Sequence, residues 1–308
     1  SIVSETRVVQ MIGQDSDKES KPLRRIFAEQ YKPLSDFIKI YEIEQKEEEI
    51  IKPESYVVLH NHSEFSISDG FGKIGYMCDV LKKKGFSAAA LTDHGSLAGA
   101  LEFQRAMLER GLKPIIGEEI YLKIEGIEQR FHLTLLVKNQ KGWENLLKLQ
   151  NLAVRKNFYY KPIVLLEELF KHSEGLICLS GCSSSPFIFF SKNGHTADAF
   201  VLMDKFKNVF GDDFYVELML HNLEGYQEAS RKLFEYGLII GLKAVITPDS
   251  HYPQKADKKY HEAIKAIGMK KLYGAAGFGD DIFYLLSSDD IKSLISGRQE
   301  LQWLSPHY

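Results

Sequence analysis

The sequence lacks the features that would place it in a membrane or in an oxidising compartment. Cysteine is scarce, with only Cys78, Cys178 and Cys182 among 308 residues. So few cysteines argue against a disulfide framework and favour a reducing compartment. We find no apolar run long enough to span a bilayer, and the polar N-terminus does not resemble a signal peptide. We therefore expect a cytoplasmic protein without membrane contact.

A strong charge of one sign is also missing. The formal net charge of -3 at pH 7 gives no general attraction to nucleic acid. Any contact with DNA must therefore be local, or must be assisted by bound cations. The sequence has no Gly-rich phosphate loop ending in Lys-Ser/Thr and no nucleophile elbow. These absences argue against P-loop nucleotide hydrolysis and against an α/β-hydrolase serine nucleophile.

The order of polar and apolar segments predicts three regions. Residues 1–53 are an N-terminal extension that is polar and without periodicity at first, and then has amphipathic helical spacing. Residues 54–290 alternate short β-rich runs with amphipathic stretches, as expected for one large α/β domain. Residues 291–308 are interpreted as a C-terminal tail.

Alternation of strand and helix signals over residues 54–290 indicates a parallel sheet. Helices are predicted over residues 73–84 and 97–110, ended by Gly85 and Gly111. Seven strands with helices between them favour a closed or nearly closed barrel, in which functional residues gather at the C-terminal ends of the strands. The expected strands are residues 56–59, 88–91, 114–121, 132–137, 176–179, 215–218 and 243–247.

Candidate metal ligands follow one another along this region, most of them at or just after an expected strand. Imidazole and carboxylate suit zinc, manganese and iron, and a thiolate biases one position toward softer metals. One such segment would mean little, but the ordered series predicts a multinuclear metal site. The nine residues are His60, His62, Asp69, His94, Glu119, His132, Cys182, Asp249 and His251.

The spacing within the series supports this interpretation. His60 and His62 are two residues apart, so on an extended segment both imidazoles lie on one face. Asp249 and His251 repeat this spacing after the last strand. Taken singly, the members have ordinary explanations, since an aspartate before a glycine is common in turns and a lone cysteine is usually a small buried side chain.

Three positions leave alternatives open. Asp93 either caps a helix or, as we prefer, orients a ligating histidine. Only one of Glu118 and Glu119 can face the site from a strand, and that one could bridge two ions. His132 begins its apolar run, which an antiparallel hairpin with the preceding strand would explain. The other histidines are interpreted as surface or helix residues: His172, His195, His221, His261 and His307.

The segments LHNHSEFSISDG, LTDHGSLAGALEF, KPIIGEEIY and ITPDSHY resemble the PHP (polymerase and histidinol phosphatase) domain, in the version found at the front of bacterial C-family replicative polymerases. The resemblance covers roughly residues 55–290. It implies a distorted (β/α)7 barrel that holds two or three divalent ions: zinc, manganese or iron. By matching motifs, one ion would take His60, His62, Glu119 and Asp249, a second would take Glu119, His132 and Cys182, and a third would take Asp69, His94 and His251.

The same resemblance implies a metal-dependent phosphodiesterase, a 3′–5′ proofreading exonuclease acting on DNA 3′ ends. Asp93, Glu119 and Asp249 are the expected catalytic residues, with Asp93 acting from behind the ligands. A C-family polymerase core is the expected partner, in cis or in trans. The alternatives are a small-molecule phosphomonoesterase of the histidinol phosphatase type and a metal-stabilised scaffold that docks a DNA polymerase.

Overall fold

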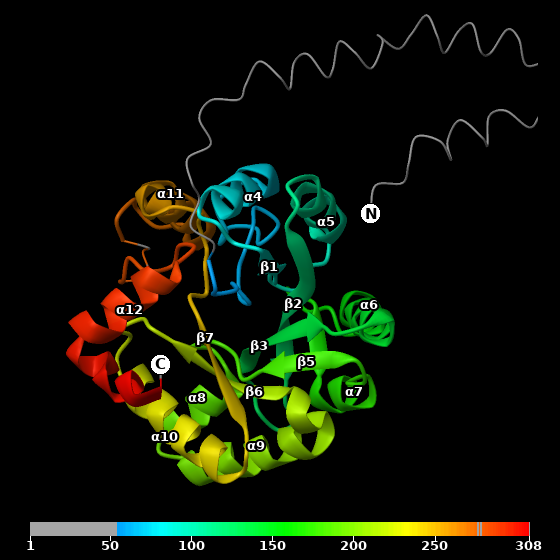
Figure 1. The fold of residues 1–308 in the computed structure, drawn as a ribbon. Helices are drawn as coiled ribbons and strands as arrows, with labels where there is room; N and C mark the ends of the chain where they lie inside the picture. Colours follow the sequence, from blue (N-terminus) through cyan, green and yellow to red (C-terminus); the bar gives the residue numbers. More distant parts are fainter. Residues whose placement is uncertain (1–53, 276, 278, 308) are drawn as a thin grey trace, which may run out of the picture. The chain divides into compact units, whose positions relative to one another are not determined.

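The computed structural model describes residues 54–275, 277 and 279–307, so the extension predicted over residues 1–53 lies outside the described residues. The described chain is a mixed α/β fold whose sheet curls into the expected distorted barrel (Figure 1). The strand order is β1-β2-β3-β5-β6-β7, and β4 pairs with β2. The strands are β1 (Ala88–Leu91), β2 (Lys113–Lys123), β3 (Arg130–Val137), β4 (Ile163–Leu165), β5 (Leu176–Leu179), β6 (Phe214–Met219) and β7 (Lys243–Thr247).

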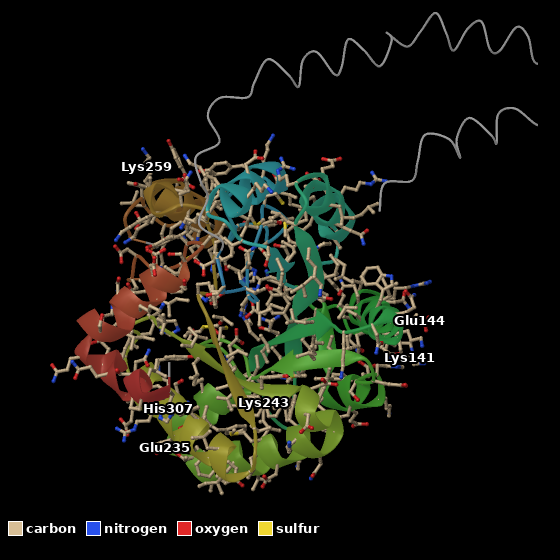
Figure 2. All side chains as sticks on the ribbon, in the orientation of Figure 1. Lys141, Glu144, Glu235, Lys243, Lys259 and His307 are labelled. Atoms are coloured by element: carbon tan, nitrogen blue, oxygen red, sulfur yellow. The ribbon has the colours of Figure 1, made fainter. Side chains whose placement is uncertain are left out.

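Amphipathic helices lie around the outside of the curled sheet (Figure 1). In α6, for example, Asn139 accepts a hydrogen bond from the backbone N–H of Gly142 and so caps the first turn. Lys141 and Glu144 of the same helix are exposed (Figure 2), while its other face is buried. The helices are α4 (Ile74–Lys83), α5 (Ala100–Glu109), α6 (Gln140–Arg155), α7 (Leu166–Lys171), α8 (Pro186–Lys192), α9 (Thr196–Phe210), α10 (Tyr226–Ile239), α11 (Lys258–Met269) and α12 (Ser288–Gly297).

Most strand pairs are parallel, and β3 is the exception. It runs antiparallel to both β2 and β5, with His132 opposite Tyr121 and Thr134 opposite Glu119. The hairpin predicted from the position of His132 is therefore confirmed. The predicted ranges of β1, β5 and β7 match the structure residue for residue. Strand β4 was not predicted, because it is only three residues long.

The segment predicted as a strand over residues 56–59 is wrong as a continuous strand. Within it only Val58 forms a bridge, to Ala89 of β1, and Asn61 then bridges to Ser250 after β7. The backbone N–H of Ala90 donates to the Val58 carbonyl at 2.7 Å, and that of His62 donates to the Ser250 carbonyl at 2.8 Å. The segment changes neighbours along its length, so it closes the barrel between β1 and β7 without forming a regular ladder.

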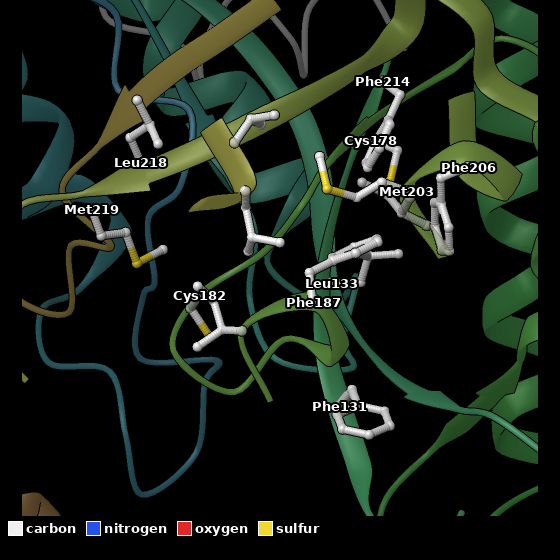
Figure 3. Packing of buried hydrophobic residues seen from close by; sticks show 14 of the residues in the cluster. Phe131, Leu133, Cys178, Cys182, Phe187, Met203, Phe206, Phe214, Leu218 and Met219 are labelled. Atoms are coloured by element: carbon white, nitrogen blue, oxygen red, sulfur yellow. The ribbon is translucent and has the colours of Figure 1, made fainter. Parts of the chain in front are cut away.

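The largest apolar cluster lies between the sheet and α8, α9 and α10. Figure 3 shows Phe187, Phe206 and Phe214 packed together on one side of this cluster, and the Phe187 and Phe206 rings meet edge to face at 5.2 Å. Cys178 is buried in the same cluster. The residues set apart as a C-terminal tail also contribute to this core, through Ile291, Ile295, Leu301 and Leu304. Within residues 54–307 as described, no helix combines the length and apolar character needed to cross a bilayer.

The hairpin that carries Glu119 leaves no room for a side chain at Gly117. A Cβ there would lie 2.4 Å from the Leu135 carbonyl oxygen and 2.8 Å from a methyl carbon of Leu136. We predict that Gly117→Ala lowers the free energy of unfolding by about 1–3 kcal/mol, because a packed strand pair must separate. Gly75→Ala in α4 is the control, since a Cβ at that position would have no atom within 4 Å. Urea unfolding of both variants checks this, and equal effects would contradict it.

Candidate metal centre

The nine predicted ligands converge inside one end of the barrel. The closing segment supplies the first two histidines, the loop before α4 supplies Asp69, and β2 and β3 supply Glu119 and His132. His94 follows β1, Cys182 follows β5, and Asp249 and His251 follow β7. Close contacts between functional atoms connect the whole set, so the structure brings all of these side chains together.

Four buried side chains form the first group: His60, His62, Glu119 and Asp249. Asp249 Oδ1 lies 3.3 Å from His60 Nε2 and 3.2 Å from His62 Nε2. The Glu119 oxygens lie 3.6 and 3.5 Å from the same two nitrogens. Neighbouring ligands of one tetrahedral ion with bonds of about 2.0–2.1 Å are separated by about 3.4 Å. These four side chains are therefore spaced as ligands of a single ion.

Glu119 also belongs to a second group, with His132 and Cys182. Its Oε1 lies 3.1 Å from His132 Nδ1 and 3.1 Å from Cys182 Sγ, and that sulfur lies 3.7 Å from His132 Nδ1. Gly181 sets the turn before Cys182, with a φ of 87° and with the His132 carbonyl oxygen 2.8 Å from where a Cβ would lie. A carboxylate shared by two groups is the arrangement of a bridging ligand.

A third group lies toward the mouth of the site. His94 Nε2 is 3.3 Å from Asp69 Oδ2, and His251 Nε2 is 3.7 Å from Asp69 Oδ1. The other nitrogen of His94, Nδ1, lies 2.5 Å from Glu119 Oε2, so this ring joins the third group to the first two. Lys265 Nζ contacts Asp69 Oδ1 at 2.9 Å and partly neutralises this carboxylate.

Several of these buried atoms have no hydrogen-bond partner. They include His60 Nε2, His62 Nε2, both ring nitrogens of His94, Glu119 Oε2 and Asp249 Oδ1. Burying such atoms unsatisfied costs roughly 1–3 kcal/mol each, more for charged groups, and native proteins rarely tolerate it. Here they face one another across a common space. Residues of this set could hold a metal ion in three overlapping combinations: His60, His62 and Glu119; His62, His94 and His251; and His94, Glu119 and His132.

The chain also resembles known protein families over most of its described length. The family model of the PHP domain matches residues 59–221. The chain belongs to the PHP domain family. It is 35% identical to DNA polymerase III subunit alpha of Aquifex aeolicus over 267 residues, which are 82% of this chain and 22% of that protein. It is 37% identical to the same subunit of Borreliella burgdorferi, over 80% of this chain and 22% of the relative.

The PHP chain thus spans about a fifth of the length of these relatives, at 22% in both cases. Among solved structures, an amidohydrolase from Chromobacterium violaceum is similar at 16% identity and a TM-score of 0.44, over 65% of this chain and 88% of that one.

Hydrogen bonds behind the PHP site fix which ring nitrogens point inward. His60 Nδ1 lies 2.7 Å from Glu217 Oε1, and because a carboxylate only accepts, Nδ1 donates to it, which leaves Nε2 as the nitrogen that would bind an ion once it is deprotonated. Glu217 is itself held by Thr247 Oγ1, which donates to it at 2.6 Å, and by the backbone N–H of Gly181 at 3.0 Å. Metal-binding histidines are commonly held in this way.

Asp93 acts on His62 through a serine. It accepts hydrogen bonds from Ser66 Oγ at 2.7 Å and from the backbone N–H of Ser63 at 2.7 Å. Because Ser66 Oγ donates its proton to Asp93, it accepts from His62 Nδ1, which lies 3.1 Å away. This leaves His62 Nε2 facing Asp249. Asp93 is therefore placed to orient His62, the role preferred for it from the sequence. It would do so through Ser66 and not by direct contact.

In the metal centre, burial and neighbouring charges raise the pKa of some groups and lower the pKa of others. Burial lowers the pKa of His60, but Asp249, Glu217 and Glu119 outweigh it and hold this pKa well above its usual value. Burial, His94 and His251 lower the pKa of His62 to about 3. Burial and Glu119 raise the pKa of the Cys182 thiol. A bound cation would lower the thiol pKa and favour the thiolate.

Some residues of the site were not predicted from the sequence. Glu217 is a single acidic residue inside an otherwise apolar buried strand, and that contrast is the signal that could have found it. The interpretation of His221 as a surface or helix residue is wrong, since it lies outside any helix and is 1% exposed. His261 does lie in a helix, α11, but it is also buried. His261 lies on the buried side of α11, with Nε2 3.9 Å from Asp69 Oδ1. Glu118 is buried too, and burial and Asp93 raise its pKa to about 8.

Glu217 offers a test of the metal centre that leaves every predicted ligand in place. We predict that Glu217→Gln weakens zinc binding by about 10–100-fold, as substitution of residues that orient ligands typically does. The amide keeps the size of the side chain, but its NH2 group competes for the position where His60 Nδ1 now donates. Calorimetric titration of the metal-free protein with zinc gives the affinity, and metal content after dialysis provides a second measure.

Glu235→Gln on α10 is the matched control, because this exposed residue pairs with Arg231 along the helix surface. Its zinc affinity should equal that of the unmodified protein. Unchanged affinity in Glu217→Gln would show that this carboxylate does not support a bound ion.

Proposed function

We propose that this PHP domain binds two or three divalent ions and hydrolyses phosphodiester bonds, most specifically as a 3′–5′ exonuclease on DNA. The observation that carries the proposal is the sharing of Glu119 between two adjoining ligand groups. His60, His62 and Asp249 would complete one group, and His132 and Cys182 the other. Asp69, His94 and His251 would hold a third ion. Clustered cations of this kind activate water and neutralise phosphoryl oxygens.

The protein side chains would provide position and charge. Glu119 and Asp249 place negative charge where cations must be held, and their burial keeps bulk water from weakening that attraction. Glu217 and the Ser66–Asp93 pair fix the rings of His60 and His62, so the ligand nitrogens point inward before an ion arrives. Such preorganisation lets a site stabilise charge without rearranging during the reaction.

The choice of DNA as substrate rests on the relatives and on the charge balance. The similar proteins are subunits of DNA polymerase III, and a hydrolytic PHP domain beside a polymerase would suit removal of misincorporated nucleotides. Bound divalent ions would offset the formal charge of -3, which by itself opposes contact with DNA. The thiolate of Cys182 favours zinc in its group, while the carboxylate-rich group with Asp249 also suits manganese. A polymerase core would be the partner, in the cytoplasm.

The first test of this function changes a single ligand. We predict that Asp249→Asn abolishes hydrolysis of a 3′-labelled single-stranded oligonucleotide and lowers metal content, with only a small shift in melting temperature. The amide lacks the charge that holds a cation and supports a bound hydroxide. Asp249 has a φ of 50°, and asparagine adopts this left-handed conformation readily, so the fold should survive.

Asp198→Asn is the control, because Asp198 is an exposed residue at the start of α9 that pairs with His195. It should keep full activity. Near-normal nuclease activity of Asp249→Asn would remove Asp249 from the site. If the unmodified protein hydrolyses histidinol phosphate but shows no nuclease activity, and Asp249→Asn loses that hydrolysis, the protein would be a phosphomonoesterase. Tight metal binding without either activity would indicate the scaffold.

The second test concerns the DNA end. We predict that a primer with mispaired 3′ nucleotides is cut faster than a fully matched primer. The metal centre is recessed, and a frayed end reaches it without the cost of unpairing and unstacking, which is a few kcal/mol. Release of labelled nucleotide from the two primers at equal concentration gives the ratio of rates. Equal rates would exclude selection of frayed ends.

A further inference from the structure

A polar cavity of about 440 Å³ lies beside the metal centre and is lined in part by His132 of the second ligand group. It is formed where the β2–β3 hairpin meets the start of β4, since Tyr121 pairs with both His132 and Ile163. Its lining is polar and carries two cationic side chains. The lining residues are Tyr121, Glu128, Gln129, Arg130, His132 and Lys161.

The cavity shares two of its wall residues with the surroundings of the metal centre. His132 lines it, and the same ring places Nδ1 3.1 Å from Glu119 Oε1. The Tyr121 ring meets the His132 ring edge to face at 5.2 Å and stacks on His94 at 6.0 Å. A ligand in the cavity would therefore lie directly against residues that contact the shared carboxylate.

Arg130 and Lys161 give this cavity a local positive charge that the chain as a whole lacks. Lys161 Nζ lies 5.1 Å from the centre of the Tyr121 ring, so a cation–π contact helps to fix its position. Arg130 donates from Nη1 to the Tyr159 carbonyl at 3.0 Å and is otherwise exposed. Glu128 is the one acidic residue of the lining, so cations are in excess there.

Three consecutive aromatic residues stand exposed next to these cations. Phe158, Tyr159 and Tyr160 are 59%, 67% and 79% exposed. The Tyr159 and Tyr160 rings meet edge to face at 4.7 Å. Tyr160 has a φ of 58°, a conformation that bulky residues rarely adopt. Large aromatic side chains that pack against no core usually mark a binding surface.

We propose that this cavity and the adjoining aromatic residues bind the single-stranded end of a nucleic acid and lead it to the metal centre. Backbone phosphates would contact Arg130 and Lys161, and bases would stack on Tyr159 and Tyr160. Basic grooves lined by aromatic side chains bind single strands in this way, and stacking accepts every base because each has a π face. The inference rests on the proposed nuclease function, which needs such sequence tolerance.

Binding can be tested separately from catalysis. A fluorescent single-stranded oligonucleotide of mixed sequence is titrated with the full chain in EDTA, and its anisotropy gives Kd. We expect Tyr160→Asn to raise Kd at least 5-fold, since stacking contributes that much or more per base. Asparagine suits the left-handed backbone of Tyr160, so folding should not suffer. Lys161→Ala should raise Kd and reduce the slope of log Kd against log salt by about 0.7, as loss of one phosphate contact does.

Lys113→Ala is the matched control, because Lys113 is an exposed lysine at the opposite end of β2. It should leave both Kd and the salt slope unchanged. A small diester, bis(p-nitrophenyl) phosphate, reports on the metal centre, and Lys113→Ala should hydrolyse it at the unmodified rate. Together these results would assign the cavity to strand binding.

Unchanged oligonucleotide Kd in both variants would overturn the inference, whatever the nuclease rate. Absence of nuclease activity in the unmodified protein, with Kd still dependent on Tyr160 and Lys161, would instead overturn only the proposed nuclease function. A duplex of equal length, tested in parallel, should bind more weakly than the single strand. Tighter binding of the duplex would also contradict the inference, because paired bases cannot stack on the two tyrosines.

Discussion

The crowding of unsatisfied polar atoms around Glu119 is the constraint on which the rest of the structure depends. Imidazole nitrogens from three segments and the Asp249 carboxylate surround this residue, which is 1% exposed. Without a cation these groups are costly to bury. Only a rigid frame can keep them together, and the barrel provides it, because Glu119 lies within a long strand that pairs on both sides. The site therefore depends on the fold, because the strands hold together charged groups that would otherwise move apart.

A layer of hydrogen bonds behind the ligands turns this crowding into a defined chemistry. Glu217 accepts a hydrogen bond from His60 Nδ1, and Ser66 accepts one from His62 Nδ1. The Asp249 carbonyl accepts one from His251 Nδ1 at 2.8 Å. In all three rings the proton lies on Nδ1 and Nε2 faces the common space. The backbone supports the arrangement at a cost, since Asp249 itself has a positive φ. Strain of this kind is usually kept where function needs it.

The sequence was informative wherever a local signal sufficed. Strands β1 and β5 are short apolar runs bounded by polar or glycine residues, and their limits, like those of β7, could be predicted residue for residue. The place of His132 at the start of its run predicted the antiparallel hairpin. The segment around Val58 could not be predicted, because its pairing depends on two neighbours far apart in sequence. For the same reason Glu217 and Lys265 escaped notice and His261 was not assigned to the site: each meets the site only through the tertiary fold.

Strand β2 joins the two parts of the site. Alternate residues of a strand share a face, so Glu119 and Tyr121 point the same way and are separated by about 6.6 Å along the strand. Glu119 lies among the candidate ligands, and Tyr121 forms a wall of the cationic cavity. If the end of a nucleic acid is held at Lys161 and Arg130, its next phosphate would therefore lie at a fixed distance from the Glu119 carboxylate. Fixing reactants in this way removes much of the entropic barrier to reaction. Because one stiff strand carries both parts, the backbone of β2 sets the distance between the cavity and the metal centre. Side-chain motion cannot change that distance.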